Sequence, residues 1–208
     1  MLYLDSAMVP DAVAAQAMGW VSGITTNPKL LAATGRRPHE QLARLLEAFP
    51  SGPVFFQPAR VDSAEAAVRS AFEIGAGRVV AKLPAQGPML TLAKRLLSEG
   101  HRVAITAVYS PAQAAVAAAI GAEWVIPYVD RASRLRPGEP VVASLRAVLD
   151  ALGSPTGILA ASIKTPEQAV AALLSGARAI SAPLAVLRAM AQDPLTESAV
   201  EEFTVAAG

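Results

Sequence analysis

The sequence contains no cysteine and only two histidines, His39 and His101. The lack of cysteine excludes disulfides and thiolate metal sites. The two histidines lie far apart in the sequence, so we expect neither a histidine metal site nor a Ser-His-Asp triad. The formal net charge is only +1, which provides no basic surface for binding nucleic acid.

Long apolar runs are also missing, although hydrophobic residues make up 53% of the chain. Polar or charged residues interrupt every run before it reaches the ~18 residues needed to span a bilayer. The first ten residues, MLYLDSAMVP, have no basic start and place Asp5 inside what would be the apolar core of a signal peptide. We therefore expect a cytoplasmic globular protein whose partners include neither a membrane nor a nucleic acid.

Lysine is scarce as well. The chain has 14 arginines but only four lysines, at positions 29, 82, 94 and 164. An arginine stays protonated, whereas a buried lysine can lose its proton. The four lysines could therefore mark places where chemistry needs an amine, or they could reflect compositional chance.

Eight short apolar segments have the length and composition of β-strands. They are residues 2–5, 21–26, 54–57, 78–83, 102–107, 124–129, 157–162 and 177–182. Alanine- and leucine-rich segments with helical spacing lie between them, at 64–75, 89–100, 110–121, 142–153 and 166–176. Ser110-Pro111 and Thr165-Pro166 are typical helix starts, with an N-cap residue followed by proline.

The alternation of strands and helices predicts a parallel α/β sheet. Eight strand–helix units predict a single-domain (β/α)8 TIM barrel spanning residues 1–208 and ending in a short C-terminal helix. A doubly wound sheet is the main alternative, but no glycine-rich phosphate-binding sequence follows the first strand. We find no linker or low-complexity segment that would divide the chain.

Polar residues close seven of the eight predicted strands. In chain order they are Asp5; Thr25, Thr26 and Asn27; Gln57; Lys82; Thr106; Tyr128 with Arg131 nearby; and Ser162 with Lys164. Catalytic groups of TIM barrels come from the carboxyl ends of the strands, so these side chains would meet at one mouth of the barrel. The alternative interpretation is that strands simply give way to polar loops.

Lys82 is the most informative of these residues. Two-residue alternation places Val80 and Lys82 on one face of the strand, and an inward face would put Lys82 inside the barrel mouth. Burial lowers the pKa of a lysine, and a neutral amine can attack a carbonyl to form a Schiff base. A buried ion pair with Asp5, or a side chain that reaches solvent, explains the pattern equally well.

Six segments together resemble the small transaldolases and are most similar to the fructose-6-phosphate aldolase branch. They are LYLD (2–5), GITTNPKLL (23–31), VVAKLP (79–84), TAVYSPAQ (106–113), PYVDR (127–131) and AASIKTP (160–166). The resemblance covers almost the whole chain. It implies a metal-independent class I aldolase or transaldolase without a cofactor, acting on sugar phosphates or dihydroxyacetone and assembled as a homo-oligomer, a pentamer or decamer.

The resemblance also implies a role for each candidate residue. Lys82 would form the Schiff base with the donor ketone, and Asp5 would take the proton of the hydroxyl at the C3–C4 bond that is cleaved. Thr106, Gln57 and Tyr128 would hold a catalytic water. The substrate would be bound by the remaining candidates, Thr26, Asn27, Arg131, Ser162 and Lys164.

Gln57 and Tyr128 indicate the aldolase branch, because transaldolases typically have glutamate and phenylalanine at these positions. A tyrosine hydroxyl can act as a general acid or base through water, although Tyr128 could instead be a core aromatic with its hydroxyl at the rim. Transaldolase proper and a non-catalytic phosphosugar-binding barrel are the alternative functions. The chain departs from the family at Lys29 and Ile126, where small residues are usual, and in its short segment after Pro194.

Overall fold

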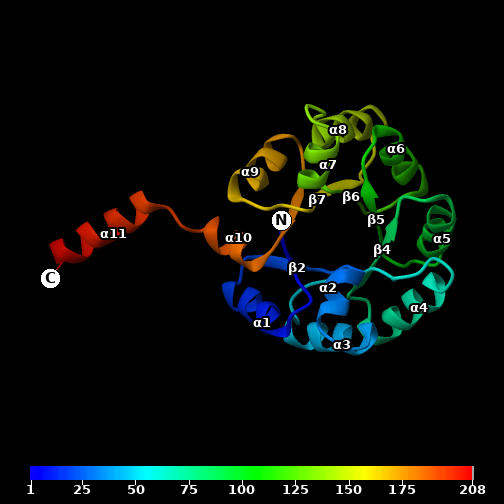
Figure 1. Cartoon of the computed structure of the whole chain (residues 1–208), viewed down its shortest axis with the longest axis horizontal. Helices are drawn as coiled ribbons and strands as arrows, with labels where there is room; N and C mark the ends of the chain where they lie inside the picture. The colour runs from blue at the N-terminus through cyan, green and yellow to red at the C-terminus, as the bar shows by residue number, and fades with distance from the viewer. Residues whose placement is uncertain (208) are drawn as a thin grey trace.

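Eight parallel strands close into a barrel, in chain order, in the computed structural model, which describes residues 1–207 (Figure 1). The strands are β1 (Leu2–Asp5), β2 (Val21–Thr25), β3 (Val54–Phe56), β4 (Val79–Pro84), β5 (Val103–Val108), β6 (Trp124–Pro127), β7 (Gly157–Ala160) and β8 (Ala179–Ala182). β1 pairs with both β2 and β8, which closes the ring. The predicted TIM barrel is confirmed and the doubly wound alternative is wrong. Gly208, the last residue of the expected domain, lies outside the described residues.

Helices surround the barrel, except for the last one, which extends away from it (Figure 1). They are α1 (Val9–Met18), α2 (Pro28–Ala33), α3 (Pro38–Ala48), α4 (Ala64–Gly75), α5 (Gly87–Ser98), α6 (Pro111–Ile120), α7 (Val129–Leu135), α8 (Val141–Ala151), α9 (Pro166–Leu174), α10 (Leu184–Ala189) and α11 (Pro194–Ala207). The predicted caps of α6 and α9 are present, because the Ser110 and Thr165 side chains accept hydrogen bonds from backbone N–H groups one turn later. Within residues 1–207, no helix is both long and apolar enough to cross a membrane.

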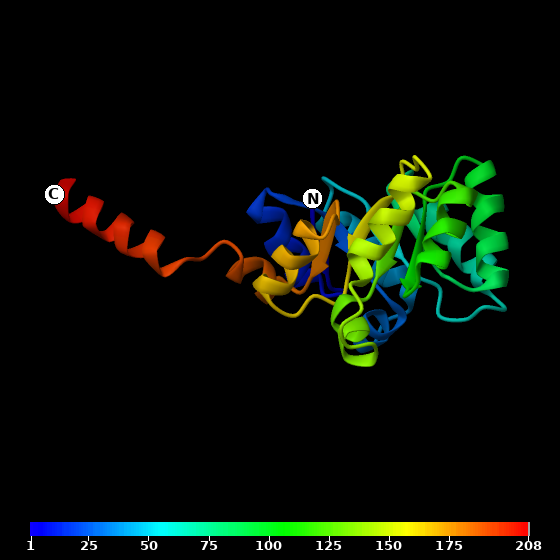
Figure 2. The same ribbon diagram turned by 90° about the horizontal axis from the view of Figure 1, so that it is seen from above.

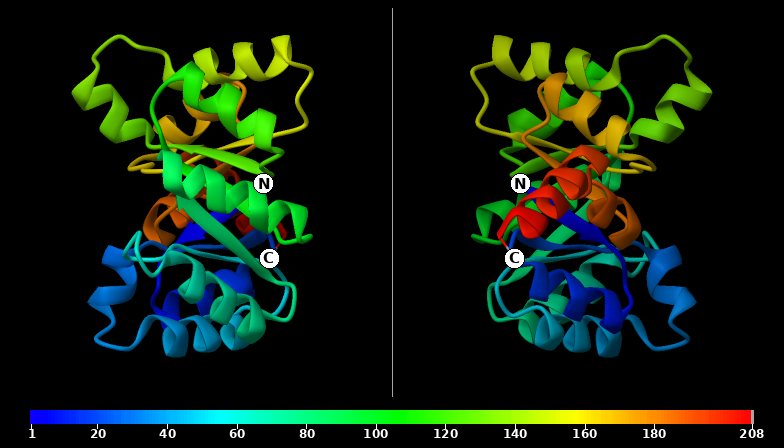
Figure 3. Two further views of the ribbon diagram at one scale, coloured as in Figure 1. Left: turned by 90° about the vertical axis from the view of Figure 1, so that its right-hand side faces the viewer. Right: turned by 90° about the vertical axis from the view of Figure 1, so that its left-hand side faces the viewer.

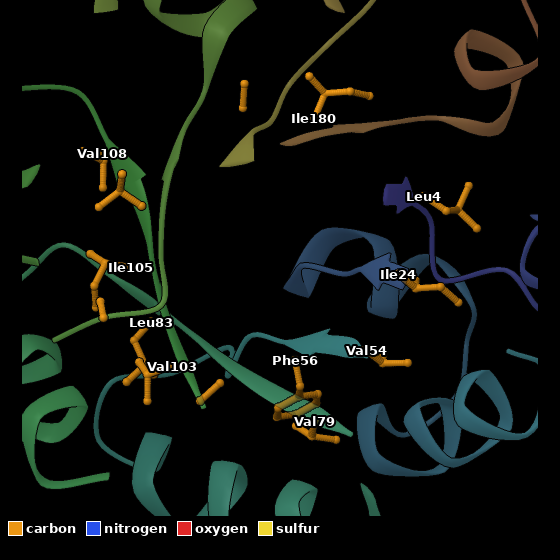
Figure 4. Packing of buried hydrophobic residues seen from close by; sticks show 14 of the residues in the cluster. Leu4, Ile24, Val54, Phe56, Val79, Leu83, Val103, Ile105, Val108 and Ile180 are labelled. Atoms are coloured by element: carbon orange, nitrogen blue, oxygen red, sulfur yellow. The ribbon is translucent and has the colours of Figure 1, made fainter. Parts of the chain in front are cut away.

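Each strand separates two apolar layers. Outward side chains pack against the helices, and Figure 4 shows part of this outer layer, including Val79, Leu83 and Ile105. Val80 belongs instead to the inner layer, which confirms the predicted alternation and places Lys82 inside. The inner layer consists of Tyr3, Phe55, Val80, Ala104, Trp124, Ile126, Leu159, Ala161 and Ala179.

Three aromatic rings fill the barrel interior below the carboxyl ends of the strands. The Tyr3 ring packs edge-on against Phe55, at 5.5 Å between centroids, and against Trp124, at 6.3 Å. Gly23 makes room for them, because a Cβ there would lie 2.6 Å from the Pro53 carbonyl oxygen and 2.9 Å from the Tyr3 ring. We call Tyr3, Phe55 and Trp124 the aromatic floor.

Helix α11 extends away from the barrel beyond α10 (Figures 1 and 2). In the right-hand view of Figure 3 it stands in front of the barrel. None of its residues is buried. Four apolar side chains of α11 are exposed: Leu195, Val200, Phe203 and Val205. At 14 residues α11 is the longest helix in residues 1–207, although the sequence led us to expect a short one.

Candidate active site

A cavity of about 530 Å³ opens at the carboxyl ends of the strands. Eight of the ten residues singled out from the sequence line it: Asp5, Asn27, Gln57, Lys82, Tyr128, Arg131, Ser162 and Lys164. The other lining residues are Pro28, Lys29, Asp130, Arg134 and Ala161. The polar strand ends therefore converge on one cavity and do not merely continue into separate loops.

Lys82 lies in this cavity with only 3% of its surface exposed. Its Nζ donates a hydrogen bond to the Thr26 carbonyl oxygen at 3.0 Å and lies 6.0 Å from the centre of the Tyr128 ring. Among the ion pairs of residues 1–207, none joins Lys82 to Asp5, so the ion-pair interpretation is wrong, and burial also rules out a side chain reaching solvent. Burial lowers the pKa of Lys82 to about 8, while the Asp5 charge acts in the opposite direction.

Asp5 is half-buried on β1, and Thr25 holds one of its oxygens. Thr25 Oγ1 donates to Asp5 Oδ1 at 3.1 Å. Burial raises the pKa of Asp5, whereas the Lys82 charge, the Thr25 hydrogen bond and the Lys164 charge each lower it. The carboxyl group thus combines an elevated proton affinity with a fixed orientation, which suits a group that must both accept and return a proton.

Thr106 and Tyr128 form a second polar pair. Thr106 Oγ1 donates to the Tyr128 hydroxyl at 3.1 Å, and Thr106 is fully buried, so it reaches the cavity only through Tyr128. Burial raises the pKa of Tyr128, and the bond from Thr106 opposes this. Gln57 Oε1 is a buried acceptor with no hydrogen-bond partner in residues 1–207. A donor bound in the cavity would complete it.

A backbone irregularity ends the inward series of β5 side chains at Thr106, which lies on the same face as the inner-layer residue Ala104. Ala107 has φ of 55°, and the pairing with β6 shifts between Thr106 and Val108. Simple alternation would direct Val108 inward with Thr106, but Val108 packs in the outer layer. The single left-handed residue at Ala107 therefore ends the inward series at Thr106, next to Tyr128.

Thr26 lies in a different place from the one expected of a substrate-binding residue. It is fully buried and does not line the cavity, because its hydroxyl donates to the Phe55 carbonyl oxygen at 2.7 Å. Its own carbonyl accepts the bond from Lys82. Asn27 does line the cavity: its Oδ1 caps α2 by accepting from the Leu30 N–H at 3.0 Å, which leaves its NH2 group as a donor.

The rim of the cavity is positively charged. Lys29, Arg131 and Lys164 line it without an ion pair in residues 1–207, whereas Arg134 is paired with Asp130 at 3.0 Å. Three of the four lysines of the chain, at 29, 82 and 164, thus line this one cavity, which favours a chemical reason over compositional chance. Ser162, two residues after β7, adopts φ of 61°, a left-handed conformation that is uncommon for a residue other than glycine.

Sequence reasoning missed Ser181 on β8. Ser181 Oγ lies 2.5 Å from Thr25 Oγ1, and both residues are buried. Two-residue alternation along residues 177–182 could have found it, since it places Ala179 and Ser181 on the same face. Within residues 1–207, no group of three or more His, Cys, Asp or Glu side chains could hold a metal ion.

A model of the transaldolase/fructose-6-phosphate aldolase family matches residues 2–207. The chain belongs to this family. The match includes all eight strands and every candidate residue, so it confirms, at the level of the family, the resemblance inferred from the six segments. Members of the transaldolase/fructose-6-phosphate aldolase family are enzymes of the transaldolase and aldolase type that act on sugar phosphates.

The buried Lys82 amine carries a prediction about stability. Its pKa is about 8 in the folded protein against an ordinary 10.5, so below pH 8 burying the ammonium opposes folding by about 3 kcal/mol. We expect Lys82→Met to raise the free energy of unfolding by up to this amount at pH 7. The gain should fall below about 1 kcal/mol by pH 10, because the unfolded chain then also begins to lose the proton.

Urea unfolding at the two pH values measures this effect. Lys94→Met is the matched control, because Lys94 is exposed on α5, and it should change stability little at either pH. Equal gains for Lys82→Met at pH 7 and pH 10 would contradict the prediction.

Proposed function

We propose that this enzyme is a class I aldolase/transaldolase that cleaves or forms the C3–C4 bond of fructose 6-phosphate, or of a related ketose, through an imine on Lys82. One observation carries the proposal: a buried lysine whose pKa is lowered to about 8 and which has no ion pair with Asp5, the nearby carboxylate of the same cavity. Such an amine has an appreciable neutral fraction near pH 7 and can act as a nucleophile.

Imine formation needs several proton transfers. The neutral Lys82 amine adds to the ketone carbon, and loss of the carbonyl oxygen as water gives an iminium. We assign these transfers to the Thr106–Tyr128 pair with Gln57, since the two hydroxyls are hydrogen-bonded at 3.1 Å and Gln57 offers a free acceptor. The positive iminium then accepts an electron pair without help from a metal or cofactor.

Asp5 drives the carbon–carbon cleavage in this proposal. It accepts the proton of the C4 hydroxyl, and the freed oxygen electron pair forms the carbonyl of the released aldehyde. The C3–C4 bond pair moves into the iminium and gives an enamine. Protonation of the enamine and hydrolysis of the imine release the free ketone and restore Lys82. The raised pKa of Asp5 favours uptake of the proton.

In this proposal, the rim of the cavity supplies the groups that bind the substrate. We assign the sugar phosphate to Arg131, Ser162 and Lys164, because a guanidinium binds phosphate in a planar fork and the loop after β7 is a frequent phosphate site in barrels. The amide NH2 of Asn27 would donate to hydroxyls of the donor. A non-catalytic phosphosugar-binding protein would need this rim alone, whereas here the rim surrounds a buried amine and a carboxyl group.

Borohydride trapping tests the imine. With dihydroxyacetone and borohydride, we expect peptide mass mapping to find a reduced adduct on Lys82. Lys82→Arg should abolish the adduct, because a guanidinium does not form the imine. Lys164→Arg is the matched control and should keep it, since Lys164 lies at the exposed rim of the same cavity. The absence of an adduct on Lys82 in the unmodified sequence would refute the mechanism and favour the binding protein.

The aldolase branch is tested through Tyr128, whose hydroxyl would protonate the enamine through water. The enzyme should release dihydroxyacetone from fructose 6-phosphate without an acceptor, and Tyr128→Phe should slow this at least about tenfold while trapping on Lys82 persists. Tyr109→Phe is the matched control and should leave the release of dihydroxyacetone unchanged. It removes a hydroxyl from a neighbouring tyrosine, whose ring packs edge-on against Tyr128 at 6.0 Å. Turnover that requires erythrose 4-phosphate would instead identify a transaldolase proper.

We also propose a homo-oligomer, a pentamer or decamer in keeping with the resemblance. Support comes from α11, whose apolar residues include Phe203 at 71% exposed and Leu195 at 82%. A neighbouring copy would cover them. Analytical ultracentrifugation should give an oligomeric mass for the full chain and a smaller mass for a chain ending at Asp193. A full chain that sediments as a monomer at micromolar concentration would refute the proposal.

A further inference from the structure

Three adjacent strands place polar side chains side by side where the barrel closes. β1 lies between β8 and β2, with Asp5 beside Thr25 and Tyr3 beside Ser181 in the pairing. Ser181 Oγ lies 2.5 Å from Thr25 Oγ1, which in turn lies 3.1 Å from Asp5 Oδ1. The two hydroxyl residues, Ser181 and Thr25, are almost fully buried, at 0% and 2% exposed, so the contact between their hydroxyls is shielded from water.

We propose that Ser181 and Thr25 form a hydroxyl relay that positions Asp5 and keeps it in its carboxylate form. Both are positioning residues, because they act through Asp5 and do not line the cavity. The relay rests on the proposed function only in that it gives Asp5 the role of base. Its existence is tested without any substrate.

The relay has one direction when Asp5 is ionised. A hydroxyl has a single proton to donate, and Thr25 gives its proton to Asp5 Oδ1. Thr25 Oγ1 can therefore only accept from Ser181, so the order is Ser181 to Thr25 to Asp5. Each donation polarises the next hydroxyl and strengthens the bond to the carboxylate.

The relay also selects the reacting oxygen. Oδ1 is occupied by Thr25, and in residues 1–207 no hydrogen bond to Oδ2 is present. Asp5 lines the cavity, so Oδ2 is the oxygen that would meet a substrate hydroxyl. Because Thr25 and Asp5 are neighbours in the sheet register, the orientation of the carboxylate follows from the strand pairing.

Charged groups act on Asp5 independently of the relay. Lys82 from β4 and Lys164 from the loop after β7 lower its pKa. The charge of Asp5 in turn raises the pKa of Tyr128, the residue directly after β6. On the outer side of the sheet, α10 packs on β1. The only charged residue of α10 is Arg188, and it is exposed. The relay is uncharged, so removing one of its hydroxyls leaves these charges in place and isolates its effect.

Carboxyl NMR titration of the full-length protein with ¹³C-labelled aspartate tests the relay, with the Asp5 signal assigned through Asp5→Asn. Loss of a donor disfavours the carboxylate, so Thr25→Val should raise the pKa of Asp5 by about one pH unit or more. Ser181→Ala should raise it by less and should add nothing in the double variant with Thr25→Val. Thr25→Ser should keep the original value.

Thr156→Val is the matched control. Thr156 is another buried threonine, whose hydroxyl donates to the Ala122 carbonyl oxygen away from Asp5, and its loss should leave the pKa of Asp5 unchanged. An unchanged value in Thr25→Val would overturn the relay, as would a full additional shift from Ser181→Ala in the double variant. If circular dichroism shows that Thr25→Val does not fold, Ser181→Ala decides, and an unchanged pKa there overturns the proposal.

Activity then separates the relay from the proposed function. Once the imine has formed, Lys82 no longer titrates as a free amine, so the low-pH limb of kcat should report Asp5. We expect this limb to move upward in Thr25→Val while borohydride trapping on Lys82 persists. A shifted NMR titration without any trapping in the unmodified sequence would support the relay and reject the aldolase mechanism.

Discussion

The burial of the Lys82 amine without a paired carboxylate is the constraint on which the rest of the structure depends. Burial brings its pKa to about 8, and this effect lasts only while bulk water is kept from beneath the amine. The aromatic floor of Tyr3, Phe55 and Trp124 excludes that water, and Gly23 leaves space for the Tyr3 ring. The aromatic floor therefore supports the proposed chemistry as well as forming part of the core.

The two-residue alternation of side chains along the strands produces both the aromatic floor and the layer of polar site residues above it. Inward residues recur every second position, so Tyr3 is followed inside the barrel by Asp5, and Val80 by Lys82. Moving either strand by one residue would turn the polar group outward onto apolar helices. The register that maximises apolar burial in the lower layer is thus the one that assembles the site, and the apolar layers offset the cost of burying an ammonium.

Periodicity was enough to predict the barrel and to place Lys82 on the same strand face as Val80, because both follow from local alternation and the count of strand–helix units. It was not enough for Thr26, whose hydroxyl donates to a carbonyl of the neighbouring strand, nor for Val108, which a left-handed residue at Ala107 directs into the outer layer. Alternation along β8 could have placed Ser181 inside the barrel, but not its contact with Thr25, which lies 156 residues away in sequence. Such pairings arise only when the ring closes.

Neutral partners explain why Lys82 and Asp5 share a cavity without forming an ion pair. A direct pair would raise the pKa of the amine and lower that of the carboxyl group, which would weaken both the nucleophile and the base of the proposed reaction. Lys82 instead donates a hydrogen bond to the Thr26 carbonyl, and Asp5 accepts one from the Thr25 hydroxyl. The carbonyl can accept a bond from either the ammonium or the neutral amine, so it does not hold the proton in place. The hydroxyl supports the carboxylate without supplying a positive charge that would suppress its basicity. In the proposed reaction, charge can then develop on a substrate bound between the two groups.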